Sequence, residues 1–356
     1  MKGKLFICMA IVTALHFAMG RADAQKKIIV DRQGKGDFLS ISEALQSLDS
    51  FSKETRIIFI RNGIYSEKVF ITKPKIIFEG ESRDGVIITQ SVARDIWRCS
   101  HDSDWGVATV NINADDITLM NLTIQNMFGF ENTSGQVISC ATGYRKDADP
   151  VRIDGHQMAL RTFDGTRIRA INVHFKAFGG DTVSPWNVSN GMYYFKDCTM
   201  EGGVDFYCPR GWAYAENCIF IAHTGEASIW HDGSANEDSK TVLKDCSFRG
   251  FDGFNLGRFH RDAQFFLINC HFANNMADRD IFLVPTKNVI KWGKRVYYYN
   301  CHRDGGDYAW FADNLSSAKD APVPGMINAQ WVFKGRWHPE NYSENPDVLK
   351  KNNGVK

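Results

Sequence analysis

The sequence predicts an all-β protein: a single-stranded, right-handed parallel β-helix, in which each coil of the chain stacks on the coil before it. The main observation is a repeated frame of Asn or Asp, then Cys, then any residue, then usually an apolar residue. Five copies carry the cysteine: Cys198, Cys218, Cys246, Cys270 and Cys301. Two earlier copies, at Asn121 and Asn172, have an aliphatic residue in its place. From Asn172 onward the copies recur after 25, 20, 28, 24 and 31 residues, a spacing typical of solenoids.

The segments between the repeats favour stacked coils over other β folds. Each copy is a short strand-like segment followed by a polar or glycine-containing turn. No helical segment long enough for a βαβ crossover separates the copies. A β-sandwich is the main alternative, but the frame keeps its phase better than alternating antiparallel strands require. The five repeat cysteines are then expected to form an inward stack of buried thiols, although stacked neighbours also approach disulfide distances, which leaves one bridge open.

The remaining elements lie at the two ends of the solenoid. Residues 40–48 place Ile41, Ala44 and Leu45 on one face of a short helix. We expect this helix to cap the first coil, whose strand edges are otherwise exposed. The tail from Asp313 onward is irregular, and its aromatic residues are expected to fold back on the coils. No linker rich in Pro, Ser or Gly marks a second domain.

Residues 1–24 have the pattern of a secretory signal peptide: a basic start at Lys2 and Lys4, an apolar stretch, and a small-x-small site ending at Ala24. Cleavage there leaves one domain, residues 25–356. It removes three basic residues and one acidic residue, so the formal charge changes from +1 to −1. A nearly neutral chain has no overall field for nucleic acid, and the apolar stretch is too short for a membrane span. We expect an exported protein in a periplasm, on a cell surface or outside the cell.

Sequence spacing selects four polar residues as a candidate site. Gln157, Asp181 and Asp205 follow one another at intervals of 24 residues, which fits one coil. Arg258 lies 53 residues after Asp205, about two coils further on. Because equivalent positions on successive coils lie about 4.8 Å apart, the four side chains are expected to form a ladder in a shallow groove.

Two neighbouring carboxylates suit acid–base and nucleophilic chemistry. Like charges this close resist ionising together, so one carboxyl group holds a proton more readily than the other. An arginine beside one of them favours the ionised form of that one, which can then act as a nucleophile. We expect neither a metal nor another cofactor, because no His/Cys cluster with zinc-ligand spacing occurs in the sequence.

Seven short motifs, in order along nearly the whole chain, resemble those of the pectinesterase (pectin methylesterase) family. The matching segments are 36–44, 63–69, 155–160, 180–183, 203–206, 256–258 and 335–339. Residues 155–160, Gly-His-Gln-Met-Ala-Leu, are similar to the motif that carries the family's catalytic glutamine. Residues 256–258, Leu-Gly-Arg, are similar to the start of another motif. The chain resembles a divergent, bacterial-type member.

The resemblance implies a carboxylic-ester hydrolase that removes methyl esters from galacturonate residues of pectin. It implies Asp205 as the nucleophile and Arg258 as the residue that keeps Asp205 ionised and oriented. Asp181 is implied as the general acid for the methoxide leaving group, and then as the base for the water that hydrolyses the acyl-enzyme. Gln157 is implied as the donor to the oxyanion. The expected partner is the pectic polysaccharide, bound by a monomer.

The sequence departs from the family pattern near the expected sugar-binding rim. Gly180 replaces a second glutamine, and the loss of one oxyanion donor typically slows acyl transfer by about 10²–10³-fold. Arg258 is followed by Phe259 and His260 in place of Pro and Trp. The side chains that we expect to contact substrate are Trp186, Phe206, Tyr207, Trp230, Phe259 and His260.

Three other functions remain open from the sequence. A β-helix glycosidase or lyase also uses carboxylates, but neither accounts for Gln157 and Arg258. A non-catalytic carbohydrate-binding solenoid is compatible with Gly180. An esterase acting on another acyl group, such as acetyl, uses the same four residues.

Overall fold

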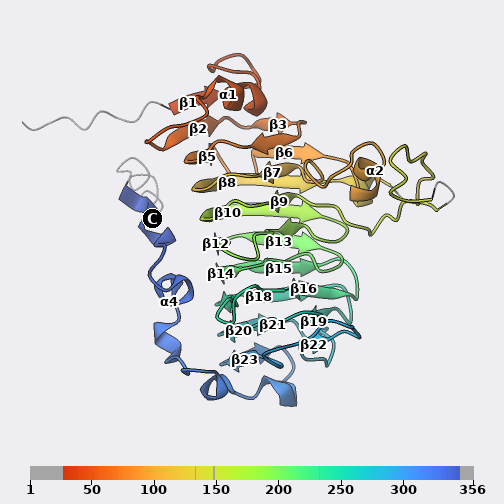
Figure 1. Cartoon of the computed structure of the whole chain (residues 1–356), viewed down its shortest axis with the longest axis vertical. Helices are drawn as coiled ribbons and strands as arrows, with labels where there is room; N and C mark the ends of the chain where they lie inside the picture. The colour runs from red at the N-terminus through yellow and green to blue at the C-terminus, as the bar shows by residue number, and fades with distance from the viewer. Residues whose placement is uncertain (1–26, 133, 147–148, 232, 345–356) are drawn as a thin grey trace, which may run out of the picture.

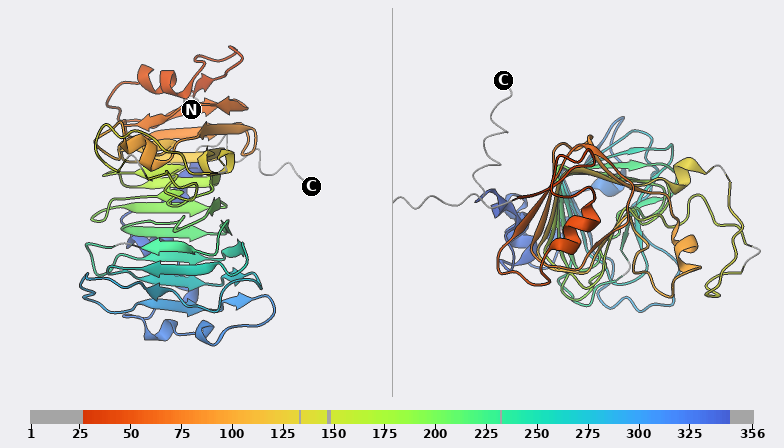
Figure 2. Two further views of the ribbon diagram at one scale, coloured as in Figure 1. Left: turned by 90° about the vertical axis from the view of Figure 1, so that its right-hand side faces the viewer. Right: turned by 90° about the horizontal axis from the view of Figure 1, so that it is seen from above.

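The computed structural model describes residues 27–132, 134–146, 149–231 and 233–344, and it is a right-handed parallel β-helix (Figure 1). Every pairing between the named strands is parallel, and each coil stacks on the one before it along a single axis (Figure 2). The fold predicted from the repeat is therefore confirmed. The expected signal peptide lies outside the described residues. No helix in the described ranges is long and apolar enough to cross a membrane.

The largest sheet carries two faces of the coil. The first face consists of β1 (Lys27–Val30), β2 (Arg56–Ile60), β5 (Ile76–Gly80), β8 (Ile117–Asn126), β10 (Ile168–Ala177), β12 (Met192–Lys196), β14 (Trp212–Glu216), β17 (Thr241–Lys244), β20 (Phe265–Ile268) and β23 (Val296–Tyr299). The second consists of β3 (Gly63–Tyr65), β6 (Val86–Gln90), the second halves of β8 and β10, β13 (Thr199–Gly202), β15 (Ile219–Ala222), β18 (Ser247–Gly250), β21 (His271–Phe272) and β24 (His302–Arg303).

Two smaller sheets form the third face, which carries the candidate site. The first contains β4 (Val69–Ile71), β7 (Val110–Ile112), β9 (Leu160–Thr162) and β11 (Val183–Ser184), and the second contains β16 (Ala227–His231), β19 (Asn255–Phe259) and β22 (Phe282–Leu283). Tyr207 joins them, because it bridges to Val183 on one side and to Ile229 on the other. The third face is therefore continuous along the coils at the level of the backbone.

The repeated Asn or Asp makes the turn between the first and second faces. Its backbone is left-handed in every copy, with φ between 50° and 54° at Asn121, Asn172, Asp197, Asn217, Asp245, Asn269 and Asn300. Asn and Asp adopt this conformation more readily than other non-glycine residues. Their side chains also bond between coils, as where Asn172 Nδ2 donates to Asn121 Oδ1 at 3.0 Å. The repeat thus encodes one turn of backbone per coil.

The cysteines that follow the turn residues point inward. All five repeat cysteines are free and at most 2% exposed, and Cys208 is also free and buried. The prediction of buried thiols is confirmed for these residues. The one disulfide in the described part of the chain, Cys99–Cys140, was not predicted, because neither cysteine belongs to the repeat.

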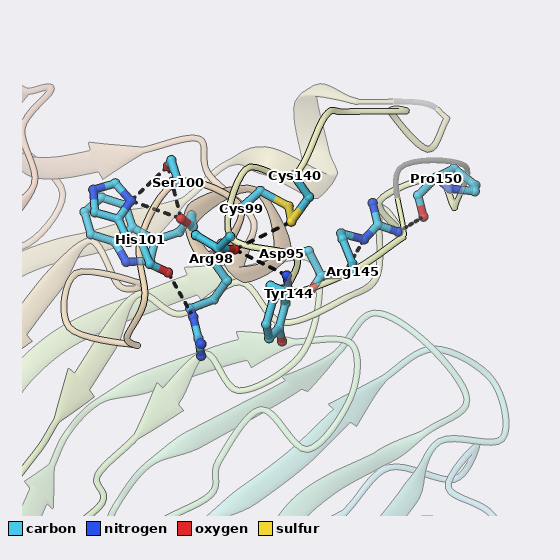
Figure 3. The surroundings of a disulfide bond; sticks show 11 residues. Asp95, Arg98, Cys99, Ser100, His101, Cys140, Tyr144, Arg145 and Pro150 are labelled. Carbon is cyan, nitrogen blue, oxygen red and sulfur yellow. Dashed lines mark hydrogen bonds and ion pairs between the residues drawn. A yellow bond between two sulfur atoms is a disulfide. The ribbon is translucent and has the colours of Figure 1, made fainter.

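This disulfide joins two segments that together form a loop region projecting from one side of the β-helix (Figure 3). One segment contains α2 (Arg94–Arg98) and the other α3 (Phe128–Glu131), and the core strands β7 and β8 lie between them in sequence. Asp104 accepts hydrogen bonds from the Arg94 guanidinium at 2.9 and 3.0 Å, and from Arg98 at 2.9 Å. The Arg94 N–H donates to the carbonyl of His156 at 2.9 Å, which ties the loop to the third face.

The N-terminal helix and the C-terminal tail cover the core where the sequence predicts. The helix α1 (Ile41–Ser47) lies over the first coil, and Ser40 and Glu43 form a capping box at its start. The tail contains α4 (Ala329–Phe333) and short 3-10 turns at Ala309–Phe311, Leu315–Ser317, Pro324–Met326 and Pro339–Glu344. It runs back along the first face, where Phe333 and Trp337 pack against an aromatic layer that includes Tyr194 and Trp212 (Figure 1).

Candidate active site

The third face brings Asp181 and Asp205 to equivalent positions on adjacent coils. Gly180 bridges to Val204, and the Asp181 N–H donates to the Val204 carbonyl at 3.2 Å. One coil earlier, the Gln157 N–H donates to the Gly180 carbonyl at 2.9 Å. The interval of 24 residues therefore corresponds to one coil at both steps.

Backbone conformation presents the two carboxylates in the same way. Asp181 and Asp205 have φ of 58° and 48°, in the left-handed region that Asp tolerates better than most residues. Close packing around the preceding residues fixes this geometry. A Cβ at Gly179 would lie only 2.0 Å from the Gly155 carbonyl oxygen, so glycine is required there. Asp181 and Asp205 are 7% and 8% exposed, so only a small part of each residue is open to solvent.

Arg258, on β19, holds Asp205 through two parallel hydrogen bonds. Its Nε donates to Asp205 Oδ1 at 2.9 Å, and its Nη2 donates to Oδ2 at 2.7 Å. This paired geometry fixes the plane of the carboxylate. Burial raises the pKa of Asp205 to about 6 against the opposing effect of Arg258, and Asp181 adds a smaller rise. At neutral pH, Asp205 is therefore mostly ionised and oriented, although its pKa is higher than the arginine alone suggests.

The Gln157 side chain does not point toward the carboxylates of Asp181 and Asp205, so the prediction that it lies in the groove with them is wrong. Its side chain is fully buried. Its Oε1 accepts the Gly129 N–H at 2.9 Å, and its Nε2 donates to the Ile153 carbonyl. The oxygen and one N–H of this buried amide are thus bonded to backbone groups. Sequence spacing placed Gln157 on the right coil but gave no information on the direction of its side chain.

The neighbouring residue, His156, takes the outward direction. Successive side chains of an extended segment point to opposite sides, and His156 bridges to Gly180 on the next coil. Its side chain is 48% exposed, and its Nε2 lies 3.9 Å from Asp181 Oδ1. The motif analysis missed His156. Alternation along an extended chain indicates that His156 and Gln157 face opposite sides, but it does not indicate which of the two lies beside the carboxylates.

Three of the six expected substrate contacts lie in the core. Phe206 and Tyr207 are fully buried, and Phe259 is 2% exposed. Tyr207 packs edge-on against Phe195 and Phe220, inside the coil. Sugar rings cannot reach these side chains, and the prediction that they line a groove is wrong. Phe206 and Phe259 directly follow Asp205 and Arg258 and point to the opposite side from them, as alternation along an extended chain predicts. Tyr207, next to Phe206, is buried as well, so alternation does not explain its position.

The other three lie nearer to the surface. Trp186 is 37% exposed, but the guanidinium groups of Arg161 and Arg210 lie 3.8 and 3.6 Å from its ring centroid. Two groups this close cannot share one face, so both faces of the indole are covered and only its edge is open. Trp230 lies beside the site, with its ring 5.3 Å from the Arg258 guanidinium and 4.5 Å from the His260 ring.

The comparison with protein families decides which family this arrangement represents. The model of the family described as Pectinesterase matches residues 27–250. The chain belongs to the pectinesterase family. It is accordingly an esterase, and the resemblance seen in the seven motifs is confirmed.

Individual relatives agree with this assignment. The chain is 28% identical over 294 residues to putative pectinesterase 11 of Arabidopsis thaliana, covering 79% of this chain and 71% of the relative. It is 30% identical over 225 residues to pectinesterase A of Dickeya chrysanthemi, covering 62% of this chain and 57% of the relative. A solved pectin methylesterase from Erwinia chrysanthemi superposes with a TM-score of 0.67 at 22% identity, over 88% of this chain and 98% of that one, which supports the fold.

Proposed function

We propose that this pectinesterase hydrolyses the methyl esters of galacturonate residues in pectin through a covalent intermediate on Asp205. The observation that carries the proposal is the carboxylate of Asp205, held by two hydrogen bonds from Arg258, one coil away from a second carboxyl group on Asp181. One oriented carboxylate beside another is the arrangement that nucleophilic attack followed by protonation of a leaving group requires.

In the first half of the reaction, an oxygen of the Asp205 carboxylate attacks the carbonyl carbon of the ester. A C–O bond forms between Asp205 and the uronate, and negative charge moves to the carbonyl oxygen. When the carbonyl re-forms, the bond to the methoxy oxygen breaks. Asp181, protonated at this stage, gives its proton to that oxygen, so methanol leaves and an acyl-enzyme anhydride remains.

In the second half, the Asp181 carboxylate accepts a proton from water. The water oxygen attacks the carbonyl carbon of the uronate, and the bond to Asp205 breaks. The products are a free uronic acid, an ionised Asp205 and a protonated Asp181. The sum of both halves is ester plus water giving carboxylate, methanol and one proton, which is released when the uronic acid ionises.

The surroundings of the two aspartates suit this division of roles. Arg258 donates a hydrogen bond to Asp205 and therefore favours the ionised form of that aspartate. Low exposure limits competing water around the nucleophile. Trp230, next to Arg258, is proposed as a contact for a sugar ring, and His260 as its neighbour at the same rim.

Product analysis on highly methylated pectin tests the reaction class. We expect methanol and new carboxylates in equal amounts, with no fall in chain length. Shorter or unsaturated chains would identify a glycosidase or lyase instead. Polymer binding without any product would favour a carbohydrate-binding role. Acetate release from acetylated pectin, without methanol, would assign the same site to a different acyl group.

We also propose that the chain works after export, as a monomer. Beyond the signal-like residues 1–24, the disulfide Cys99–Cys140 supports an oxidising compartment, since disulfides persist mainly outside the cytosol. Mass spectrometry of the mature protein from its own host, together with its solution mass, tests both points. A retained Met1 or a stable dimer would contradict them.

A further inference from the structure

Ester hydrolysis at this site requires a hydrogen-bond donor that the expected residues do not supply. When Asp205 attacks, the carbonyl oxygen becomes an oxyanion, and donors placed at that oxygen typically contribute about 10²–10³-fold in rate each. Gly180 has no side chain, and the Gln157 side chain is fully buried, with its Oε1 and its Nε2 each bonded to a backbone group. Another side chain that faces the two aspartates can supply this donor.

His156 is placed to be that donor. It lies on the coil before Asp181, where its backbone bridges to Gly180, and the approach of its Nε2 to the Asp181 carboxylate shows that the imidazole lies on the same side as that carboxylate. Its Nε2 is 3.9 Å from Asp181 Oδ1, too far for a direct hydrogen bond and close enough for both groups to contact one ligand. The side chain is half exposed, so a ligand can reach it.

Packing around Gly180 explains why the imidazole fits there. A Cβ at position 180 would lie 3.1 Å from His156 Cδ2 and 3.0 Å from the Val204 carbonyl oxygen. Both contacts are tighter than ordinary van der Waals distances. A larger side chain at position 180 would therefore require both the imidazole and the Val204 carbonyl to shift by a few tenths of an ångström.

We propose that His156 donates a hydrogen bond from Nε2 to the oxyanion that forms when Asp205 attacks the ester. This inference rests on the proposed function and adds a catalytic residue to it. With its proton on Nε2, the imidazole is a donor of the same kind as a side-chain amide. The step transfers no proton, so the ring returns unchanged after each turnover. His156 also lowers the pKa of Asp205, although less than Arg258 does, which agrees with its place beside the nucleophile.

The test compares three variants with the wild type, using methanol release from methylated pectin. For His156→Ala we expect kcat to fall by about 10²–10³-fold with KM changed by less than about threefold, because the donor acts on the transition state. His156→Gln keeps an N–H donor and should retain activity within about tenfold of the wild type. His271→Ala is the matched control, since His271 is also half exposed and paired with an aspartate, and should leave kcat unchanged.

A double variant tests the exchange between the two positions. His156→Ala removes the contact between position 180 and the ring, and a small shift at the Val204 carbonyl then makes room for a side chain, so adding Gly180→Gln should raise kcat about tenfold above that of His156→Ala. Equal thermal unfolding midpoints across the set would show that the coils remain intact.

Three outcomes overturn the inference. They are a kcat for His156→Ala within threefold of the wild type, a loss confined to KM, or a His156→Gln variant as inactive as His156→Ala. In each of these cases the wild type still releases methanol, so the proposed function stands. A wild type that releases no methanol overturns the proposed function itself, and the inference with it.

Discussion

At the scale of single residues, two opposing effects act on Asp205. Burial disfavours its charged form, and the paired hydrogen bonds from Arg258 favour it. The result is a carboxylate whose pKa is about 6, close enough to neutrality that most molecules carry the nucleophilic form at pH 7. A carboxylate of higher pKa is also a stronger nucleophile than a fully exposed one. Burial therefore contributes to reactivity as well as to orientation.

This pKa predicts the acid limb of the pH–rate profile. Asp205 has to be ionised to attack, so kcat/KM should fall as pH drops through about 6, by about tenfold per pH unit below it. Initial rates between pH 4 and 8, with a parallel check of folding by circular dichroism, measure it. A kcat/KM that stays constant down to pH 4 in a folded protein would contradict a pKa of about 6 for Asp205.

For these residues, the sequence indicated the position along the stack of coils but not the direction of each side chain. An interval of 24 residues fits one coil, and it correctly brought Asp181 and Asp205 together. Interval alone does not specify the direction of a side chain, because adjacent residues on extended chain face opposite sides. The error at Gln157 and the omission of His156 are the same shift of one residue. Phe206 and Tyr207 follow Asp205 in sequence and are both fully buried, which neither the interval nor the alternation of side chains specifies.

At the scale of elements, the repeat combines a turn with a buried thiol. The left-handed Asn or Asp bends the chain between two strands, and the next residue then points to the axis. The cysteine Sγ atoms donate to backbone carbonyls of the preceding coil, as Cys270 Sγ does to Leu243 at 3.5 Å. These thiols are spacers within the core, and their burial keeps them away from oxidants.

Burial predicts how the cysteines react. In the native protein, the six free thiols of the described chain should be inert toward a thiol-specific reagent such as Ellman's, because each is at most 2% exposed. In guanidinium chloride all six should react, while Cys99 and Cys140 respond only after reduction. A thiol that reacts quickly under native conditions, or fewer than six after unfolding, would contradict the stack.

The projecting loop is the element that the sequence predicted least. Its cysteines follow no repeat, and disulfide partners cannot be deduced from eight candidates without contacts. The structure connects this loop to the site, since the Arg94 N–H donates to the His156 carbonyl. The loop therefore supports the strand segment that carries the proposed oxyanion donor.

At the scale of the whole molecule, the C-terminal tail covers one face of the solenoid. The outer side of the first face is unusually aromatic, and residues such as Tyr194 and Phe266 would be exposed without the tail. The tail buries this surface with Val332, Phe333 and Trp337, so it contributes to stability without touching the active site. The aromatic residues after Asp313 were sufficient to predict this, because an isolated, irregular segment has few other ways to bury them.

Truncation of one tail side chain tests that contribution. Phe333 is fully buried, and Phe333→Ala should lower the free energy of unfolding by about 3–5 kcal/mol. Met326→Ala, at a residue that is 63% exposed in the same tail, should change it by less than about 0.5 kcal/mol. Denaturant unfolding measures both. If the two variants had equal stability, the tail would not be packed as described.

The measurement that tests the central claim most directly is methanol release by Asp205→Asn. Asparagine has nearly the same shape and tolerates the same left-handed backbone, but its amide is not a nucleophile. We predict a loss of at least about a thousandfold in kcat. Asp245→Asn, at another left-handed aspartate in the turn ladder, should match the wild type. Methanol release by Asp205→Asn within tenfold of the wild type would contradict the account.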